Sequence, residues 1–251
     1  MCSSCRRSWW TQIEQETVTP ISPAYGKELR CIRCQSRAPH IQSPQYCPAC
    51  FTQWRCDRDA AIFWARTLLP PRCSRQDWVI LDTETTGLDQ MAEIVEISII
   101  APDGRVLLDT LVRPLNSIPP TATAIHHISD VMVTTAPQFP DVYNELIGLL
   151  QGRVVVTYNA AFDRRVLRQA QQRYKLPSIH AMRWACAMQQ NARYRGEWNA
   201  ARRAYRWKHL ESGDHTALGD CRATLQLLHQ MAASKLSMEE VCEFRPLAYQ
   251  R

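Results

Sequence analysis

The chain has 251 residues, with 30 Lys and Arg against 24 Asp and Glu, and a formal net charge of +6. This length suits one or two domains, and no run of about 18 apolar residues offers a transmembrane helix, so we expect no membrane association. The amino terminus lacks the apolar core of a signal peptide, which predicts a cytoplasmic protein. Residues 1–72 carry 10 basic against 5 acidic side chains, so the basic excess lies in the amino-terminal third and favours an acidic partner such as nucleic acid.

Cysteine pairs dominate the beginning of the chain: Cys2-x-x-Cys5, Cys31-x-x-Cys34 and Cys47-x-x-Cys50. Two such turns complete a tetrahedral zinc site, and the last two pairs have the spacing of a zinc ribbon. Cys2 and Cys5 would then need other partners, or would share a zinc with the second pair, so we expect one or two structural Zn²⁺ ions. Disulfides or a redox pair are the alternatives. Such modules clamp nucleic acid, dock a protein partner or only stabilise the fold.

The remaining elements follow in chain order. Residues 57–69 have helical spacing, and Pro70-Pro71 ends that helix, which predicts a cysteine-rich module with its connecting helix over 1–72. Strand-like runs cover 78–82, 94–101 and 105–112, the last two joined by a turn at 102–104. Helical and strand patterns then alternate over 139–150, 154–157 and 160–174. We therefore predict an α/β domain with a mixed sheet over 73–235, followed by a tail over 236–251.

Acidic residues stand at three points of that domain. Asp82 and Glu84 follow a buried strand and point to the same face, where two like charges call for a cation or a proton between them. Asn159 and Asp163 are four residues apart at a helix start, so both can face one cleft. His215 precedes a helix that carries Asp220 in its first turns.

Taken together, Asp82-x-Glu84, Asn159-x3-Asp163 and His215-x4-Asp220 resemble the three motifs of the DEDDh exonucleases, the DnaQ-like or RNase T-like family, over about residues 78–231. The resemblance implies an RNase H-like fold in which Asp82, Glu84, Asp163 and Asp220 surround two Mg²⁺ or Mn²⁺ ions, with His215 as general base. It also implies that the Thr85–Leu88 segment cradles the terminal nucleotide. The full set of expected substrate contacts is Thr85, Thr86, Gly87, Leu88, His126, Asn159, Phe162 and Arg164. The cysteine-rich module is not part of the resemblance, and His127 and Tyr158 depart from the family pattern.

The implied activity is a metal-dependent 3′–5′ exonuclease acting on single-stranded 3′ ends, with DNA preferred and a nucleoside 5′-monophosphate as product. The alternatives are RNA 3′-end processing and a non-enzymatic adaptor that works through its zinc module. Residues 193–208 interleave cations and aromatics, which predicts either a surface for single strands or two amphipathic helices. Family members also occur as dimers. The pathway stays open among DNA repair, proofreading in trans, RNA maturation and defence.

Overall fold

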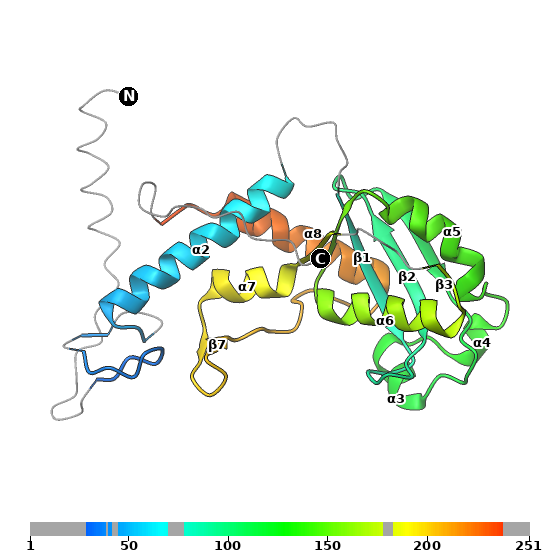
Figure 1. Cartoon of the computed structure of the whole chain (residues 1–251), viewed down its shortest axis with the longest axis horizontal. Helices are drawn as coiled ribbons and strands as arrows, with labels where there is room; N and C mark the ends of the chain where they lie inside the picture. Colours follow the sequence, from blue (N-terminus) through cyan, green and yellow to red (C-terminus); the bar gives the residue numbers. More distant parts are fainter. Residues whose placement is uncertain (1–28, 39, 42–44, 70–77, 178–182, 238–251) are drawn as a thin grey trace, which may run out of the picture.

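Figure 1 shows the computed structural model, which describes residues 29–38, 40–41, 45–69, 78–177 and 183–237. Cys2 and Cys5, the predicted boundary near residue 72 and the tail beyond residue 237 lie outside these residues. Five strands form one sheet in the order β3-β2-β1-β4-β5. They are β1 (Trp78–Thr85), β2 (Ile94–Ile100), β3 (Val106–Leu111), β4 (Val154–Thr157) and β5 (Arg183–Cys186). β1 pairs antiparallel with β2 and parallel with β4, which confirms the predicted α/β fold with a mixed central sheet.

The two faces of β1 pack into two separate cores. Val79 and Leu81 pack with side chains of α5 (Phe139–Leu150) and α6 (Ala160–Arg173). Trp78 and Ile80 pack instead with α8 (Ala217–Ala233) and with α2 (Pro48–Leu68). Because strand side chains alternate, Asp82 and Glu84 continue the face covered by α8, and Thr83 continues the face covered by α6.

The helix predicted for residues 57–69 begins earlier, at Pro48, and ends at Leu68. Pro48 occupies the first turn, where its fixed φ suits a helix and its missing N–H needs no partner. The third Cys-x-x-Cys pair, Cys47 and Cys50, therefore lies at a helix start. At its other end α2 buries Ala61, Trp64, Ala65 and Leu68 in the core that contains Ile80, Cys221 and Leu228. The helix thus belongs to both the cysteine-rich segment and the sheet domain.

Short elements complete the described part of the chain. α3 (Pro120–His126) and α4 (Asp130–Val133) follow β3, and α7 (Ala187–Arg195) follows β5. α7 ends at Gly196, whose φ of 76° is left-handed, and a hairpin of β6 (Trp198–Asn199) and β7 (Ala204–Tyr205) comes next. The alternative of two amphipathic helices over 193–208 is therefore wrong beyond Arg195. No helix among the described residues is long and apolar enough to cross a membrane.

Candidate active site

Three of the predicted carboxylates converge at the carboxyl end of β1. Asp82 and Glu84 of β1 and Asp220 of α8 each place an oxygen within 4.8 Å of the others. A β-bulge between Glu84 and Thr85 ends the regular pairing of β1 with β2 just beyond them. Carboxylate oxygens at such spacing are the ligands that Mg²⁺ and Mn²⁺ prefer.

The charge states of this cluster fit a cation site. Burial, and then the charges of Asp163, Asp220 and Glu84, raise the pKa of Asp82 well above its usual value. Burial and the neighbouring carboxylates raise the pKa of Glu84 to about 8. Burial also raises the pKa of Asp220, although nearby His215 opposes that shift. The buried Oδ1 of Asp220 has no hydrogen-bond partner among the described residues.

The start of α8 places Asp220 by close packing. Thr216 caps the helix, its Oγ1 accepting the Gly219 N–H at 3.0 Å. Gly213 leaves room for the carboxylate, because a Cβ at residue 213 would lie 2.5 Å from Asp220 Oδ1. His215 lies between these residues with a left-handed φ of 59° and an exposed side chain. The predicted general base is therefore accessible to solvent beside Asp220.

Asp163 lies beside the group of three but not within it. Only 3% of its surface is exposed, and its Oδ1 accepts a hydrogen bond from Thr83 Oγ1 at 3.0 Å instead of joining the group of three. The reason is topological, since α6 covers the face of β1 on which Thr83 lies. Burial raises the pKa of Asp163 to about 7, and the Thr83 hydrogen bond opposes the rise. Its charge still reaches Asp82.

A further acidic residue, Glu96 of β2, was not among the predicted site residues. It lies opposite Glu84 in the β1–β2 ladder, and its Oε2 accepts the Ala217 N–H at 2.7 Å. Burial raises its pKa. The sequence signal was a single charged residue within the apolar run of β2. Glu96 thus connects the sheet to the first residue of α8.

The predicted nucleotide cradle, Thr85–Leu88, is held in place from two sides. Thr86 pairs with Glu93, its N–H donating to the Glu93 carbonyl at 2.8 Å and its Oγ1 accepting the Glu93 N–H at 2.9 Å. Thr85 Oγ1 donates to the Gly87 carbonyl at 2.7 Å. From α6, Arg165 donates a hydrogen bond to the Leu88 carbonyl at 3.0 Å. Leu88 itself is 78% exposed. An apolar side chain is thus presented on an ordered loop.

His126 is buried at the end of α3. Its Nδ1 accepts the Ile128 N–H at 3.0 Å, so the neutral imidazole carries its proton on Nε2. Burial lowers its pKa, which favours this neutral form. Nε2 is buried against the Thr85 main chain. Its donor therefore faces the cradle.

The remaining predicted contacts come from the start of α6. Asn159 is the exposed N-cap residue of that helix, and its side chain makes no capping hydrogen bond, so the amide is available to a ligand. Phe162 is partly buried beneath the guanidinium of Arg165, 5.2 Å from the ring centre. Arg164 is partly exposed beside them. These side chains belong to the helix that carries Asp163.

Four cysteines of the amino-terminal segment form a second cluster. The sulfurs of Cys31, Cys34, Cys47 and Cys50 lie within 4.8 Å of one another, and none of the four is in a disulfide. Cys34 Sγ and Cys47 Sγ are 3.8 Å apart, which fits tetrahedral bonds of about 2.3 Å from a shared Zn²⁺. The donor set therefore fits one structural metal ion.

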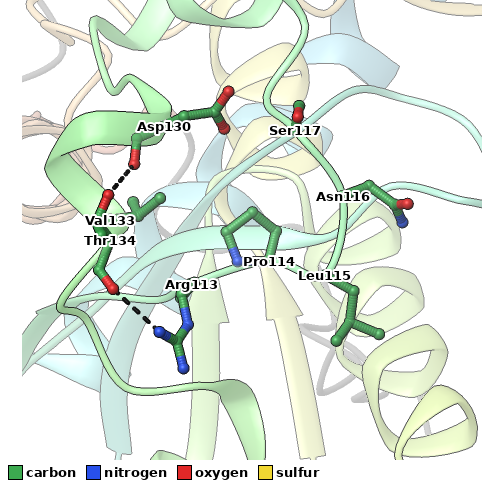
Figure 2. A pocket seen from close by; sticks show the side chains of 8 residues that line it. All are labelled: Arg113, Pro114, Leu115, Asn116, Ser117, Asp130, Val133 and Thr134. Carbon is green, nitrogen blue, oxygen red and sulfur yellow. Dashed lines mark hydrogen bonds between the residues drawn. The ribbon is translucent and has the colours of Figure 1, made fainter.

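A cavity of about 260 Å³ lies apart from both clusters, between residues 113–117 and α4 (Figure 2). Arg113 donates to the Thr134 carbonyl at its edge. Glu93 fixes the 113–117 segment from beneath by accepting the N–H groups of Leu115 and Asn116. None of the predicted catalytic residues lines this cavity, so it is not the catalytic site.

The family model for exonucleases, RNase_T, matches residues 79–228. The chain therefore belongs to this family, and its sheet domain is that of a 3′–5′ exonuclease. It is 40% identical to the uncharacterized exonuclease CP81 of Escherichia phage 186 over 62% of this chain and 88% of that protein.

Other relatives match over smaller shares of their length. Exodeoxyribonuclease 10 of Escherichia coli K12 is 34% identical over 59% of this chain and 66% of that protein. A DNA polymerase III subunit epsilon-like protein of Rhodobacter capsulatus is 39% identical, but the match spans only 14% of it. The nuclease domain of 3′hExo, a DEDDh family member bound to rAMP, shares the fold, with a TM-score of 0.50 at 15% identity over 67% of this chain and 98% of that one.

Proposed function

We propose that this protein removes nucleoside 5′-monophosphates one at a time from single-stranded 3′ ends, with DNA preferred over RNA. The observation that carries the proposal is the convergence of Asp82, Glu84 and Asp220 within 4.8 Å beside an exposed histidine. The family match supports the reaction class, and the similarity to an exodeoxyribonuclease supports DNA.

In this proposal each residue has a separate task. Asp82, Glu84, Asp163 and Asp220 would hold two Mg²⁺ or Mn²⁺ ions, which would help to orient the attacking water and to stabilise the leaving 3′ oxygen. His215 accepts the proton of that water as its oxygen attacks the last phosphorus. The P–O3′ bond then breaks, which leaves a shortened strand with a 3′-hydroxyl.

The substrate contacts follow from the same geometry. The exposed Leu88 side chain packs against the terminal base, and His126 Nε2–H donates to the terminal nucleotide. Asn159, Phe162 and Arg164 contact the nucleotide or its phosphate from the start of α6. A terminal base must be unpaired to reach this loop, which favours single-stranded ends.

The deciding experiment is a gel time course on 5′-labelled DNA and RNA of one sequence, with Mg²⁺, Mn²⁺ or a chelator. We expect ladders that shorten from the 3′ end, no reaction in chelator, and faster loss of DNA. His215→Ala should slow the reaction at least about 100-fold, as expected for a general base. His229→Ala, an exposed histidine on α8, is the matched control and should retain activity. If the wild-type protein leaves the substrate intact in every lane, the proposal is refuted. Faster loss of RNA than of DNA would reverse the proposed preference.

We further propose that Cys31, Cys34, Cys47 and Cys50 bind one structural Zn²⁺. Metal analysis of the purified protein tests this directly. Cys47→Ser should lower the zinc content by about one ion per chain, whereas Cys186→Ser, a buried cysteine of β5, should leave it unaltered. Equal zinc content in wild type and Cys47→Ser would contradict the assignment.

A further inference from the structure

The β6–β7 hairpin is fixed on its inner side by the cysteine-rich segment. Trp198 and Tyr205 pack edge to face with ring centres 5.2 Å apart, and the Arg33 guanidinium lies over both rings. Arg33 donates to Tyr205 Oη at 2.8 Å, and Tyr205 donates in turn to Asp57 at 2.6 Å. The inner aromatic side chains are therefore occupied by internal packing.

The approach to the hairpin is fixed as well. Tyr46 donates to the Gly196 carbonyl at 2.6 Å, and Trp54 Nε1 donates to the Arg193 carbonyl at 3.1 Å. A Cβ on Gly196 would lie 2.0 Å from Trp54 Nε1, so the indole closes onto the glycine. The hairpin is thus held without any ligand, which lowers the entropy cost of binding one.

The outer side of the hairpin carries positive charge that the described residues do not neutralise. Arg202, Arg203 and Arg206 are exposed and make no ion pair with another described residue. By contrast, the nearby Lys208 ammonium forms an ion pair with the Glu197 carboxylate at 2.6 Å. Next to Arg206 lies Trp207, which is 51% exposed. Exposed cations beside an exposed aromatic ring suit the phosphates and bases of a single strand.

The segment after the hairpin leads to the acidic site. Tyr158, the residue before Asn159, donates to the Lys208 carbonyl at 2.7 Å. From Lys208 the chain runs to His215 and into α8, and Figure 1 shows this path from the hairpin toward the sheet. A nucleic-acid strand whose 3′ end lies at Asp82 can therefore run past the hairpin as it leaves the site.

We propose that Arg202, Arg203, Arg206 and Trp207 form a binding surface for the upstream part of a single-stranded nucleic acid. This inference rests on the proposed exonuclease function, because that function places the 3′ end. An acidic protein would match the charges alone. The exposed indole and the path of the chain to the acidic site favour nucleic acid.

Binding is measured by fluorescence anisotropy with a labelled 20-nucleotide DNA in buffer without added Mg²⁺ or Mn²⁺, which prevents degradation and leaves the cysteine cluster its metal. The test variant is Arg202→Gln/Arg206→Gln. The matched control is Lys175→Gln/Lys235→Gln, which removes the same charge from exposed residues elsewhere. We expect the test variant to bind about 10-fold more weakly at low salt, with the slope of log affinity against log salt shallower by about 1.4 for two lost phosphate contacts. The control should change affinity less than 2-fold.

Kinetics separate this inference from the function on which it rests. The test variant should lose more kcat/KM on the 20-mer than on a trinucleotide, which is too short to reach the hairpin. Wild type that degrades neither substrate would refute the exonuclease proposal, and the anisotropy measurement would still decide the binding surface. Equal affinity of test and control variants for the 20-mer would overturn the inference. Binding of polyglutamate, a mimic of an acidic protein, is measured in parallel. A test variant that loses affinity for polyglutamate but not for DNA would also overturn the inference, since that result would assign the surface to an acidic protein.

Discussion

Glu96 connects the acidic site to the segment that carries His215. Its carboxylate accepts the Ala217 N–H at 2.7 Å, at the first residue of α8. Glu96→Ala leaves that donor unpaired, which should lower the free energy of unfolding by about 1.5–3 kcal/mol and slow cleavage. Glu96→Gln retains an acceptor and should recover most of both losses. Thermal unfolding and the gel assay measure the two effects, and equal behaviour of Ala and Gln would contradict the positioning role.

Gly213 tests how closely Asp220 must be packed. A Cβ at this residue would lie 2.5 Å from Asp220 Oδ1, so Gly213→Ala should displace the carboxylate and weaken Mg²⁺ binding about 10-fold or more. Calorimetric titration with Mg²⁺ measures the loss. Gly148→Ala is the control, because nothing lies within 4 Å of its added Cβ and alanine favours α5 by about 0.5–1 kcal/mol. Unaltered affinity in Gly213→Ala would refute this account.

The raised pKa values of Glu84 (about 8) and Asp163 (about 7) predict how the metal-free protein responds to pH. Ordinary carboxyl groups titrate near pH 4, so between about pH 4 and 8 the folded state holds protons that the unfolded chain has released. The free energy of unfolding therefore falls as pH rises through this window. In chelator we expect a lower Tm at pH 8 than at pH 6, and a larger stabilisation by Mg²⁺ at pH 8. A metal-free Tm that rises between these values would contradict the predicted repulsion.

At the scale of elements, α2 is part of the nuclease core. Trp64 is 6% exposed and packs in the core of Ile80 and Leu228. Trp64→Ala should therefore destabilise the whole fold by about 3–5 kcal/mol. Phe63→Ala, the neighbouring aromatic residue at 45% exposure, should cost at most about 1 kcal/mol. Urea unfolding of both variants gives the comparison, and similar losses would place α2 outside the core.

Local sequence patterns predicted the elements whose periodicity matches their packing. β1 and α5 fall where alternation and helical spacing placed them, and the same alternation put Asp82 beside Glu84. Contacts between distant residues decided the rest. The Tyr205–Asp57 hydrogen bond spans 148 residues and belongs to a hairpin that local composition did not distinguish from a helix. The hydrogen bond from Thr83 to Asp163 likewise joins residues 80 apart in the chain, and no spacing rule predicts it.

At the scale of the molecule, the cysteine cluster and the hairpin form one unit. Disrupting the four-sulfur site by Cys31→Ser/Cys47→Ser should free Arg33 and Tyr46 from their places and loosen residues 196–208. Hydrogen exchange should then show lost amide protection in that segment, while α5 in the same variant serves as the internal reference. Unaltered protection at 196–208 would show that the hairpin stands without the cluster.

The contacts between α2 and the segment after α8 also bear on synthesis at the ribosome. Arg66 donates to the carbonyls of Ala232 and Ser234, and the Ser237 N–H donates to Asp59 across 178 residues. At a translation rate of about 5–20 residues per second, Ser237 is synthesised on the order of 10–30 s after Asp59. Trp64 and Leu68 stay without their core during that interval. A complete nuclease therefore forms only after residue 237 has been made, and until then the nascent chain beside its own messenger carries no finished acidic site.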